Sequence, residues 1–474
     1  MTNSMTLRAL AIGASAAALA ACASLPGGPE PTGPKPADHY AADQSFTAPA
    51  ADWPAEDWWT AYGDPQLGQL IQEALAGSPD MAAAQARVSS ARAALGDARS
   101  ALFPTLAGQA SVAETKESYN AGIPPAFVPH GYNDFGDLQL NLSYDFDLWG
   151  KTRSAVAAAT SDAKASQADL AQARLILSTA VAADYADLSR LYAEREVAVR
   201  ALETRRQTLD LVSQRVTNGL DTRAELKQAE ANVPAAQGDI EQLDEQIAQT
   251  RDALAALLGA GPDRGLAIQP PAAASLKPFG LPPRLGADLV GRRPDVVAAR
   301  WRAEAAAKRI GVAKAQFYPD INLSAYVGQQ SLFVRDLFAP GSDIGQFGPA
   351  LTLPIFEGGR LRAGLKGAEA DYASAVATYD GAVVEALRQV ADTAASERSL
   401  AQRLTDAQDA LTAQEEAYKV ARLRYEGGLA NYQTVLLAED DLLQRRRALV
   451  DLQARAFTLD IQLVKALGGG FRQA

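Results

Sequence analysis

A stretch of 68 residues, 151–218, constrains the fold of this chain more than any other feature. It contains neither proline nor glycine, is rich in alanine, and carries a large apolar residue every three or four positions. These residues are Leu177, Val181, Tyr185, Leu188 and Tyr192. The pattern predicts a single helix about 100 Å long at about 1.5 Å per residue, several times the length of an ordinary globular helix. A compact domain has no need of such a rod.

A strand with one apolar face comes directly before this helix. From Leu138 to Leu148, leucine and aromatic residues alternate strictly with polar residues. Such a strand, joined to a very long helix, indicates a membrane-embedded sheet that continues into a projection across an aqueous gap. The polar face is expected to line water and to favour cations, unless it is the solvent face of a soluble sheet. Its residues are Gln139, Asn141, Ser143, Asp145 and Asp147.

Composition excludes several classes of function. Asp and Glu outnumber Lys and Arg by 56 to 45, so we expect no nucleic-acid partner. One cysteine and two histidines rule out a disulfide within the chain and give no support to a metal cluster. No catalytic triad or phosphate loop is recognisable, so we expect neither an enzyme nor a cofactor. After residue 22 no apolar run approaches 18 residues, so no transmembrane helix is expected.

The N-terminus has the features of an export signal. Arg8 precedes an apolar run, which predicts a secretory signal over residues 1–21. The following Leu19-Ala20-Ala21-Cys22 resembles the lipobox of bacterial lipoproteins, which implies that Cys22 is the lipid anchor and that Ala23 directs release to the outer membrane. Ordinary cleavage beside Ala23 is the alternative. Proline-rich residues then predict a tether.

The rest of the chain is a tandem repeat. Phe103-Pro104 recurs as Tyr318-Pro319, a displacement of 215, and Leu140 and Leu142 match Leu351 and Leu353, a displacement of 211. Each copy is predicted to contain a helix, two strands, a long helix, a tight turn and a returning helix. The helices are expected at 79–102, 151–218 and 221–258, and at 294–317, 360–426 and 429–467. The predicted domains are the signal (1–21), the tether with a Trp-rich segment (22–69), the first repeat (70–262), a proline-rich linker (263–287), the second repeat (288–468) and a tail (469–474).

Two kinds of motif resemble a known family. The run Trp58-Trp59 with Tyr62 and Asp64-Pro65, and two turns displaced by 209, resemble the TolC-like outer-membrane efflux factors, particularly the NodT-like lipoprotein subgroup. The resemblance implies a mainly α fold with a membrane β-barrel, in which four strands per chain close as a homotrimeric, twelve-stranded barrel above long helical hairpins. From the residues alone, only some oligomer is required to close four strands.

The resemblance also implies a function and its partners. The chain would be the passive, gated exit duct of a tripartite efflux pump in the outer membrane, and would export drugs or other small molecules. Its partners would be a periplasmic adaptor, an inner-membrane transporter of the resistance-nodulation-division (RND) class and outer-membrane lipid. A duct for secreted protein or polysaccharide is the alternative. A structural coiled-coil lipoprotein or an adaptor would not need two pairs of alternating strands.

The two turns carry the candidate site residues. By resemblance they form the periplasmic tips that dock the adaptor, although glycine at such positions also simply ends a helix. The tip residues are Arg215, Gly219, Leu220, Arg424, Gly428 and Leu429. We expect Asp221, Arg223 and Glu225 to help close the periplasmic mouth; a solvated helix start is the alternative. In the second copy the equivalent positions are uncharged, which departs from the pattern of better-known relatives: they are Ala430, Tyr432 and Thr434.

Overall fold

The computed structural model describes residues 32–36, 39–42, 44–272, 274–283 and 285–473. The predicted signal and lipid anchor, including Cys22, lie outside these residues. The chain divides into two compact units. Among the described residues, the sheet unit includes Ser89–Ala165 and Ala299–Thr378, and the hairpin unit includes the described parts of Lys35–Val88, Ser166–Ala298 and Tyr379–Ala474. Each is described by itself below.

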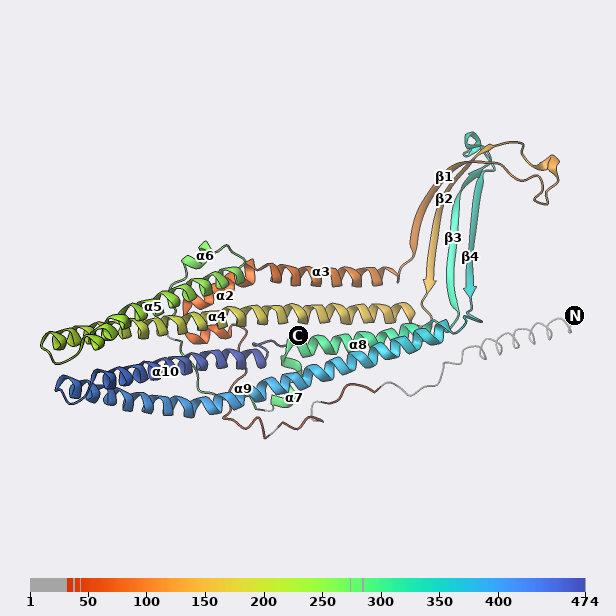
Figure 1. Ribbon diagram of the computed structural model, residues 1–474. Coiled ribbons are helices and arrows are strands. Elements are labelled where there is room, and N and C mark those ends of the chain that lie inside the picture. The colour runs from red at the N-terminus through yellow and green to blue at the C-terminus, as the bar shows by residue number, and fades with distance from the viewer. Residues whose placement is uncertain (1–31, 37–38, 43, 273, 284, 474) are drawn as a thin grey trace. The chain divides into compact units, whose positions relative to one another are not determined.

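The sheet unit contains a four-stranded antiparallel sheet in the order β1-β2-β3-β4 (Figure 1). Its strands are β1 (Thr105–Thr115), β2 (Asn133–Phe146), β3 (Asp320–Ser331) and β4 (Asp343–Thr352). The strand register places large apolar side chains from all four strands on one face, where they are exposed. They include Leu106, Val112, Leu138, Leu140, Val327, Phe347 and Leu351. This confirms the predicted alternation and extends it across the whole sheet.

Two details of the strand prediction are wrong. Strand β2 begins at Asn133, five residues before the predicted start, because its ladder with β1 continues through Phe135 and Gly136, where the alternation is broken. It ends at Phe146 rather than Leu148, since Asp147 leaves the sheet and accepts hydrogen bonds from the backbone N–H groups of Thr152 (3.0 Å) and Arg153 (2.9 Å). Asp147 therefore caps the following helix instead of belonging to the polar face of the strand.

The strand pairing also revises the repeat. Thr105 pairs with Ser143, and Asp320 pairs with Thr352. Moving β1 onto β3 by 215 residues brings Thr105 to Asp320, and the pairing then brings Ser143 to Thr352, a displacement of 209. The predicted displacement of 211 for the second strand is thus wrong by two residues. Because side chains alternate with a period of two, the apolar face is unaffected.

The long helices are confirmed almost to the residue. Helices α4 (Lys151–Thr217) and α9 (Arg360–Glu426) each contain 67 residues. Helices α3 (Pro79–Ser100) and α8 (Pro294–Ala315) end two residues before their predicted limits, ahead of the Phe-Pro and Tyr-Pro pairs that disfavour helical backbone. None of the helices in the described residues is long and apolar enough to cross a membrane.

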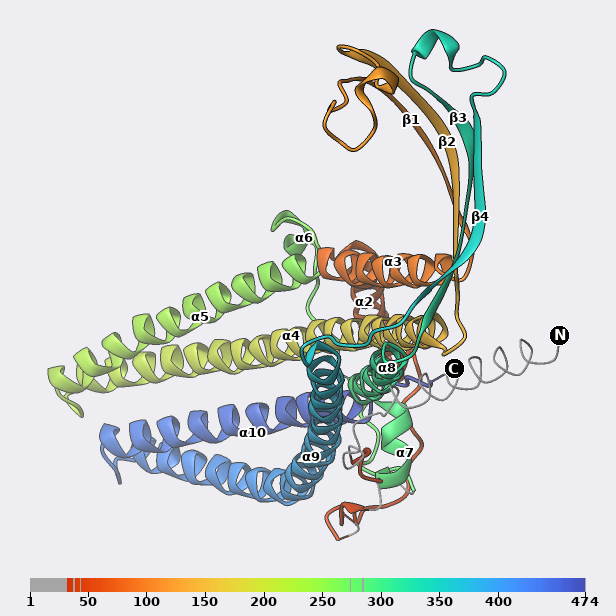
Figure 2. The same cartoon turned by 90° about the vertical axis from the view of Figure 1, so that its right-hand side faces the viewer.

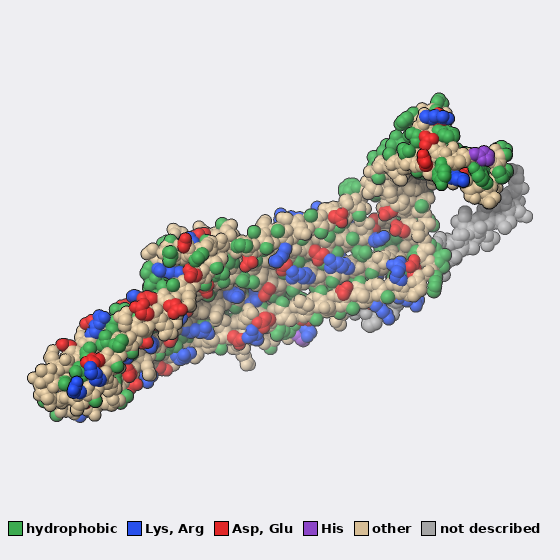
Figure 3. All heavy atoms as spheres, turned by 45° about the horizontal axis from the view of Figure 1, so that its top comes forward, with side chains coloured by type: hydrophobic (Ala, Val, Ile, Leu, Met, Phe, Trp, Pro, Cys, Tyr) green, Lys and Arg blue, Asp and Glu red, His purple; other side chains and the backbone are tan. Residues whose placement is uncertain are grey.

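In the hairpin unit, α5 (Arg223–Leu257) returns beside α4, and α10 (Tyr432–Ala466) returns beside α9, as Figures 1 and 2 both show. Shorter helices in the described part of this unit include η2 (Trp58–Tyr62), α2 (Pro65–Gly77), α6 (Asp263–Leu266) and α7 (Leu285–Arg292). Helix α7 begins inside the segment predicted as linker. Acidic and basic side chains are interspersed on the face shown in Figure 3, with no broad basic surface there.

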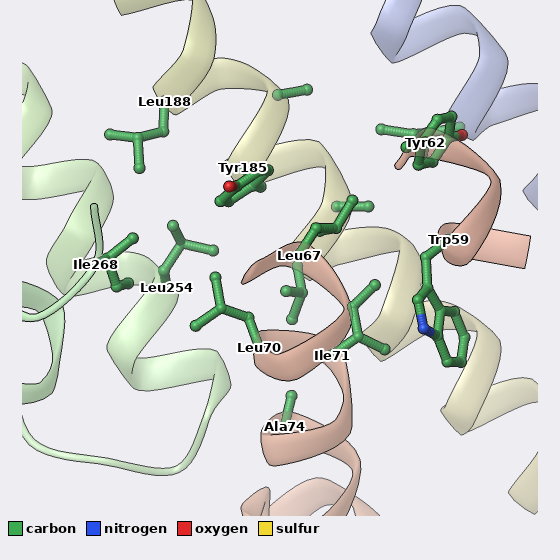
Figure 4. Packing of buried hydrophobic residues seen from close by; sticks show 14 of the residues in the cluster. Trp59, Tyr62, Leu67, Leu70, Ile71, Ala74, Tyr185, Leu188, Leu254 and Ile268 are labelled. Atoms are coloured by element: carbon green, nitrogen blue, oxygen red, sulfur yellow. The ribbon is translucent and has the colours of Figure 1, made fainter. Parts of the chain in front are cut away.

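The main core of the hairpin unit is built around α2. Its apolar residues, with Trp59 and Tyr62 of η2, face Tyr185 and Leu188 of α4 and Leu254 of α5 (Figure 4). Burying each large apolar side chain contributes about 1.5–3 kcal/mol. The α2 residues are Leu67, Leu70, Ile71 and Ala74. Helices η2 and α2 therefore pack on the first hairpin, and Tyr62 also contacts Phe457 of α10 with 4.8 Å between ring centres.

A half-buried acid gives this unit a pH dependence. Burial and the nearby carboxylate of Asp460, opposed by the positive charge of Arg455, together raise the pKa of Glu397 to about 7. Burial also raises the pKa of Asp460, which accepts a 2.6 Å hydrogen bond from the Tyr62 hydroxyl. The folded protein keeps the proton on Glu397 to a higher pH than the unfolded chain does. The contribution of this proton to stability is therefore complete below about pH 4.5 and is lost as the pH rises through about 7.

We therefore expect thermal stability to fall between pH 5.5 and pH 8, and Glu397→Gln to reduce that fall, because the amide stays uncharged. Thermal unfolding of the detergent-solubilised protein at both pH values measures the difference. Glu385→Gln is the control. Glu385 lies on the same helix, but the hydrogen bond from Arg388 is the main cause that lowers its pKa to about 2, so its charge does not change between pH 5.5 and pH 8. Equal pH dependence in the wild type and Glu397→Gln would contradict the assignment.

Candidate functional site at the helical turns

The two helical turns have the same backbone structure. In the first, the Leu220 N–H donates to the Arg215 carbonyl (2.8 Å) and the Gly219 N–H donates to the Val216 carbonyl (3.0 Å). In the second, Leu429 donates to Arg424 (2.7 Å) and Gly428 to Tyr425 (3.0 Å). This pair of bonds is the Schellman motif, which requires a left-handed residue at the glycine. The φ angles of Gly219 and Gly428 are 70° and 71°.

The leucine that follows each glycine is exposed to solvent. Leu220 is 63% exposed and Leu429 is 74% exposed. In many Schellman motifs this residue packs on the last turn of its own helix. Here the residue that would receive it is Arg215 or Arg424. Each turn thus presents an apolar side chain beside a glycine, and a Cβ added to either glycine would meet no described atom within 4 Å.

Arg215 links the two turns of the chain. Its Nε lies 2.9 Å from Oδ2 of Asp221, and its guanidinium carbon lies 4.4 Å from the centre of the Tyr425 ring. The Tyr425 hydroxyl donates to the same Asp221 oxygen, and the Arg215 Nη1 donates to the Glu426 carbonyl at 3.4 Å. We call Arg215, Asp221 and Tyr425 the turn clamp. Arg424, the counterpart of Arg215 in the second turn, is exposed.

The turn clamp packs against a small apolar core through its tyrosine. Tyr425 is fully buried against Val212, Ala229, Tyr432 and Val435. Burial raises the pKa of the Tyr425 phenol, and the hydrogen bond to Asp221 raises it further, so the hydroxyl remains a donor at physiological pH. The hydrogen bond with Asp221 likewise raises the pKa of Arg215. Arg215 therefore keeps its positive charge over the whole physiological range.

Of the three predicted gate residues, the structure brings only Asp221 into contact with the second hairpin. Glu225 accepts a 2.6 Å hydrogen bond from the Thr222 backbone N–H, which caps the start of α5. Arg223 is exposed at the first position of α5. The sequence equivalent of Arg223 in the second copy, Tyr432, is buried and accepts a hydrogen bond from Asn232 (3.2 Å). The uncharged residue that replaces arginine in the second copy therefore contributes to apolar packing.

Tyr425 is the member of the turn clamp that the sequence analysis did not single out. The repeat displacement of 209 pairs it with Val216, so the two turns differ at this position. An aromatic residue that replaces an aliphatic one within otherwise equivalent turns is a signal that the turns have different partners. Aligning the two repeats by their matching residues does not draw attention to a position where they differ.

A second polar contact joins the hairpins further from the turns. Arg205 of α4 lies 3.5 Å from Glu439 and 3.3 Å from Asp440, both on α10. Glu439 is buried, and burial raises its pKa. Its repeat equivalent, Glu230, instead forms a 2.6 Å pair with Lys227 on its own helix. The two glutamates match in sequence but not in role.

The polar face of the sheet is a second candidate region. Asn322 of β3 donates to Ser143 (3.0 Å) and to Asp145, and Gln139 donates to Asp137 (2.6 Å). These contacts confirm that Gln139, Ser143 and Asp145 share one face of the sheet. Among the described residues, no group of three or more His, Cys, Asp or Glu side chains is arranged to hold a metal ion.

Comparison with known proteins identifies the family. The sequence profile described as outer membrane efflux protein matches residues 70–260 and 285–469. The fusaric acid resistance protein FusA of Burkholderia cepacia is 42% identical over 316 residues, which cover 66% of this chain but only 59% of FusA. The multidrug resistance outer membrane protein MdtP of Escherichia coli K12 is 31% identical over 428 residues, 87% of this chain and 86% of MdtP.

A solved structure shows the same fold. The crystal structure of the outer membrane protein VceC from Vibrio cholerae superposes with a TM-score of 0.83 and 45% sequence identity, and the match covers 89% of this chain and 100% of VceC. The matched family is one of efflux channels, not of enzymes. The two family matches and these similarities together cover most of the described chain. The chain belongs to the outer membrane efflux protein family.

Proposed function

We propose that three copies of this chain form the passive exit duct of a tripartite efflux pump. The observation that carries the proposal is the pair of equivalent turns, each with an exposed leucine beside an open, left-handed glycine. The sheet supports it, because β1 and β4 are its outer strands and a membrane-embedded sheet must have its edges paired. Three copies supply twelve strands, an even number within the bacterial range.

The turns are proposed to dock a periplasmic adaptor. Leu220 and Leu429 offer apolar side chains, and Gly219 and Gly428 let a partner's backbone approach closely. Exposed Arg424 adds a cation to the second turn. Arg215, predicted as a docking residue, is proposed instead to act through the turn clamp, since its guanidinium is engaged with Asp221 and Tyr425.

The turn clamp is proposed to hold the duct closed within each chain. Opening requires the two hairpins of a chain to separate at the turns, which breaks the contacts of Asp221 with Arg215 and Tyr425. Arg223 and Glu225 lie at the start of the same helix and are proposed to act between neighbouring chains. In this proposal Asp221 acts within a chain, whereas Arg223 and Glu225 act between chains.

We propose drugs or other small molecules as the exported class, delivered by an RND-type inner-membrane transporter. The names of FusA and MdtP associate those relatives with resistance to fusaric acid and to multiple drugs. Deleting the gene should lower the tolerated concentrations of several unrelated drugs, and complementation should restore them. Loss of a secreted protein or polysaccharide with unchanged drug tolerance would favour the rival secretion duct. Cross-linking from Leu429 to an adaptor tests the tripartite assembly.

We expect the mature chain to begin at a lipidated Cys22. Each buried CH₂ of an acyl chain contributes about 0.8 kcal/mol, so several chains hold an N-terminus firmly in the membrane. Intact mass measurement of the purified protein is the test, with Cys22→Ser as the control that should lack the added acyl mass. A mature chain that begins at Ser24 without lipid would contradict the prediction.

A further inference from the structure

A buried acid lies where the two hairpins of the hairpin unit meet. Glu439 of α10 is 2% exposed, and its Oε1 lies 3.5 Å from Nε of Arg205 on α4. Among the described residues, neither of these two atoms has a hydrogen-bond partner. The hydroxyl of Tyr418 on α9, which is close enough to feel the charge of Glu439, is also buried without one. We call Glu439, Arg205 and Tyr418 the buried junction.

Burying the charge of Glu439 costs free energy. A carboxylate taken out of water needs well-aligned hydrogen bonds, and a buried ion pair that lacks them does not recover the cost of desolvation. The pKa of Glu439 has the same cause. Burial raises this pKa above its ordinary value of 4.5, although the charge of Arg205 lowers it. The folded hairpin unit therefore favours Glu439 with a proton.

The polar groups around Glu439 come from all four helices. The titratable or charged ones are Arg205 of α4, Tyr418 of α9, and Asp440 and Tyr432 of α10. Helix α4 adds the Thr208 hydroxyl, and α5 adds the Asn232 carbonyl, which accepts a 3.3 Å hydrogen bond from Nη1 of Arg205. Nη2 of Arg205 donates to half-exposed Asp440 at 3.3 Å. Arg205 therefore keeps two partners when Glu439 is neutral.

The duplication does not repeat the buried junction. At a displacement of 209, the counterparts of Glu439, Arg205 and Tyr418 are Glu230, Gln414 and Leu209. Glu230 lies at the helix surface, where Lys227 donates to it at 2.6 Å. A hairpin of this fold therefore does not need a buried acid at this position, and the cost of Glu439 calls for another explanation.

We propose that ionised Glu439 favours separation of the two hairpins of a chain and so makes the duct easier to open. The inference rests on the proposed function, in which the hairpins separate at the turns and the turn clamp opposes this. Glu439 lies about two helical turns from the start of α10, so separation at the turns admits water to its carboxylate. The hydrated carboxylate no longer carries the cost of burial. Rising pH therefore favours the open duct, because the closed state binds the proton more tightly.

Planar-bilayer recordings test the direction of this effect. In Asp221→Ala, which lacks the turn clamp, the open fraction should rise between pH 5 and pH 8. Each unit by which the pKa of Glu439 differs between the two states changes their ratio by up to about tenfold. Asp221→Ala/Glu439→Gln should be less open at pH 8 and lose most of this pH dependence. Asp221→Ala/Glu230→Gln is the matched control and should behave like Asp221→Ala. A more open channel with Glu439→Gln would overturn the proposal, because the ion pair would then hold the hairpins together.

Thermal unfolding in detergent measures the cost of the buried charge without any reference to gating. Glu439→Gln should unfold at a higher temperature than the wild type at pH 8, and the difference should be smaller at pH 5, where more of the wild-type protein carries the proton. Arg205→Gln should steepen the loss of stability with rising pH, since Arg205 lowers the pKa of Glu439. Equal pH dependence in the wild type and Glu439→Gln would show that the buried charge carries no such cost, and the inference would be wrong.

The two measurements separate this inference from the proposed function. If Glu439→Gln changes stability as expected but leaves the conductance of Asp221→Ala unchanged, the effect on opening is overturned and the turn clamp stands. If Asp221→Ala itself has wild-type conductance, the gating role of the clamp fails and the effect of Glu439 on opening fails with it. The unfolding measurement still reports the cost of the buried charge in that case.

Discussion

Gly219→Trp and Gly428→Trp should each leave the amount of assembled channel unchanged and reduce drug tolerance to that of a deletion strain. A side chain at a left-handed position costs about 1–2 kcal/mol, which a large helical assembly absorbs. The turns have room for a ring, because among the described residues no atom lies within 4 Å of a Cβ at either glycine. The ring would stand where an adaptor must approach the backbone.

The control for this experiment is Gly63→Trp. Gly63 ends η2 with a φ of 75°, and a Cβ there also meets no described atom within 4 Å, so the strain and the space match those at the turns. This variant should trimerise and export like the wild type. If the two turn variants trimerise, cross-link to the adaptor and export normally, the glycines only end their helices and the docking assignment is wrong.

Asp221→Ala should give a channel with a severalfold higher conductance in planar bilayers. The substitution removes the acceptor shared by Arg215 and Tyr425, and loss of such a partner costs about 1–3 kcal/mol. Tyr425→Phe should have a smaller effect, because it removes one hydrogen bond but keeps the ring beneath the Arg215 guanidinium. The same order should appear in cells as sensitivity to large antibiotics that the outer membrane normally excludes.

The other gate residues calibrate this result. Arg223→Ala and Glu225→Ala should raise conductance less than Asp221→Ala, since neither residue belongs to the turn clamp. Glu225→Gln keeps an acceptor for the Thr222 N–H and serves as the control for damage to the helix cap. Wild-type conductance in Asp221→Ala would refute a gating role for the clamp. Wild-type conductance in Arg223→Ala and Glu225→Ala would return these two residues to ordinary helix surface.

Helix positions were predictable because they depend on local chemistry. The absence of proline and glycine from 151–218 predicts α4 to within a residue, and the Phe-Pro and Tyr-Pro pairs predict where α3 and α8 end to within two. The strand register was harder, because matching leucines two residues apart satisfies the same face. Only the pairing of backbone groups distinguishes a displacement of 209 from one of 211.

The turns were located correctly, but the contacts between them were not predictable. Nothing in the local sequence shows that Arg215 reaches Tyr425, which lies 210 residues further along the chain and on another hairpin. The chemistry of Asp221 likewise depends on two partners, of which only Arg215 is close in sequence. Sequence periodicity determines which face of a helix is apolar, whereas contacts between distant helices depend on how the hairpins pack.

The turn clamp breaks the symmetry that the duplication would otherwise create. Two repeats of the same fold in each of three chains would place six similar tips around the mouth, with sixfold pseudosymmetry. Because Tyr425 replaces Val216, the clamp joins the tips in pairs, one pair in each chain. The mouth would then present two alternating kinds of groove, one inside a chain and one between chains. An adaptor with six identical hairpins would meet two chemically distinct sites. The mouth would then open with threefold rather than sixfold symmetry.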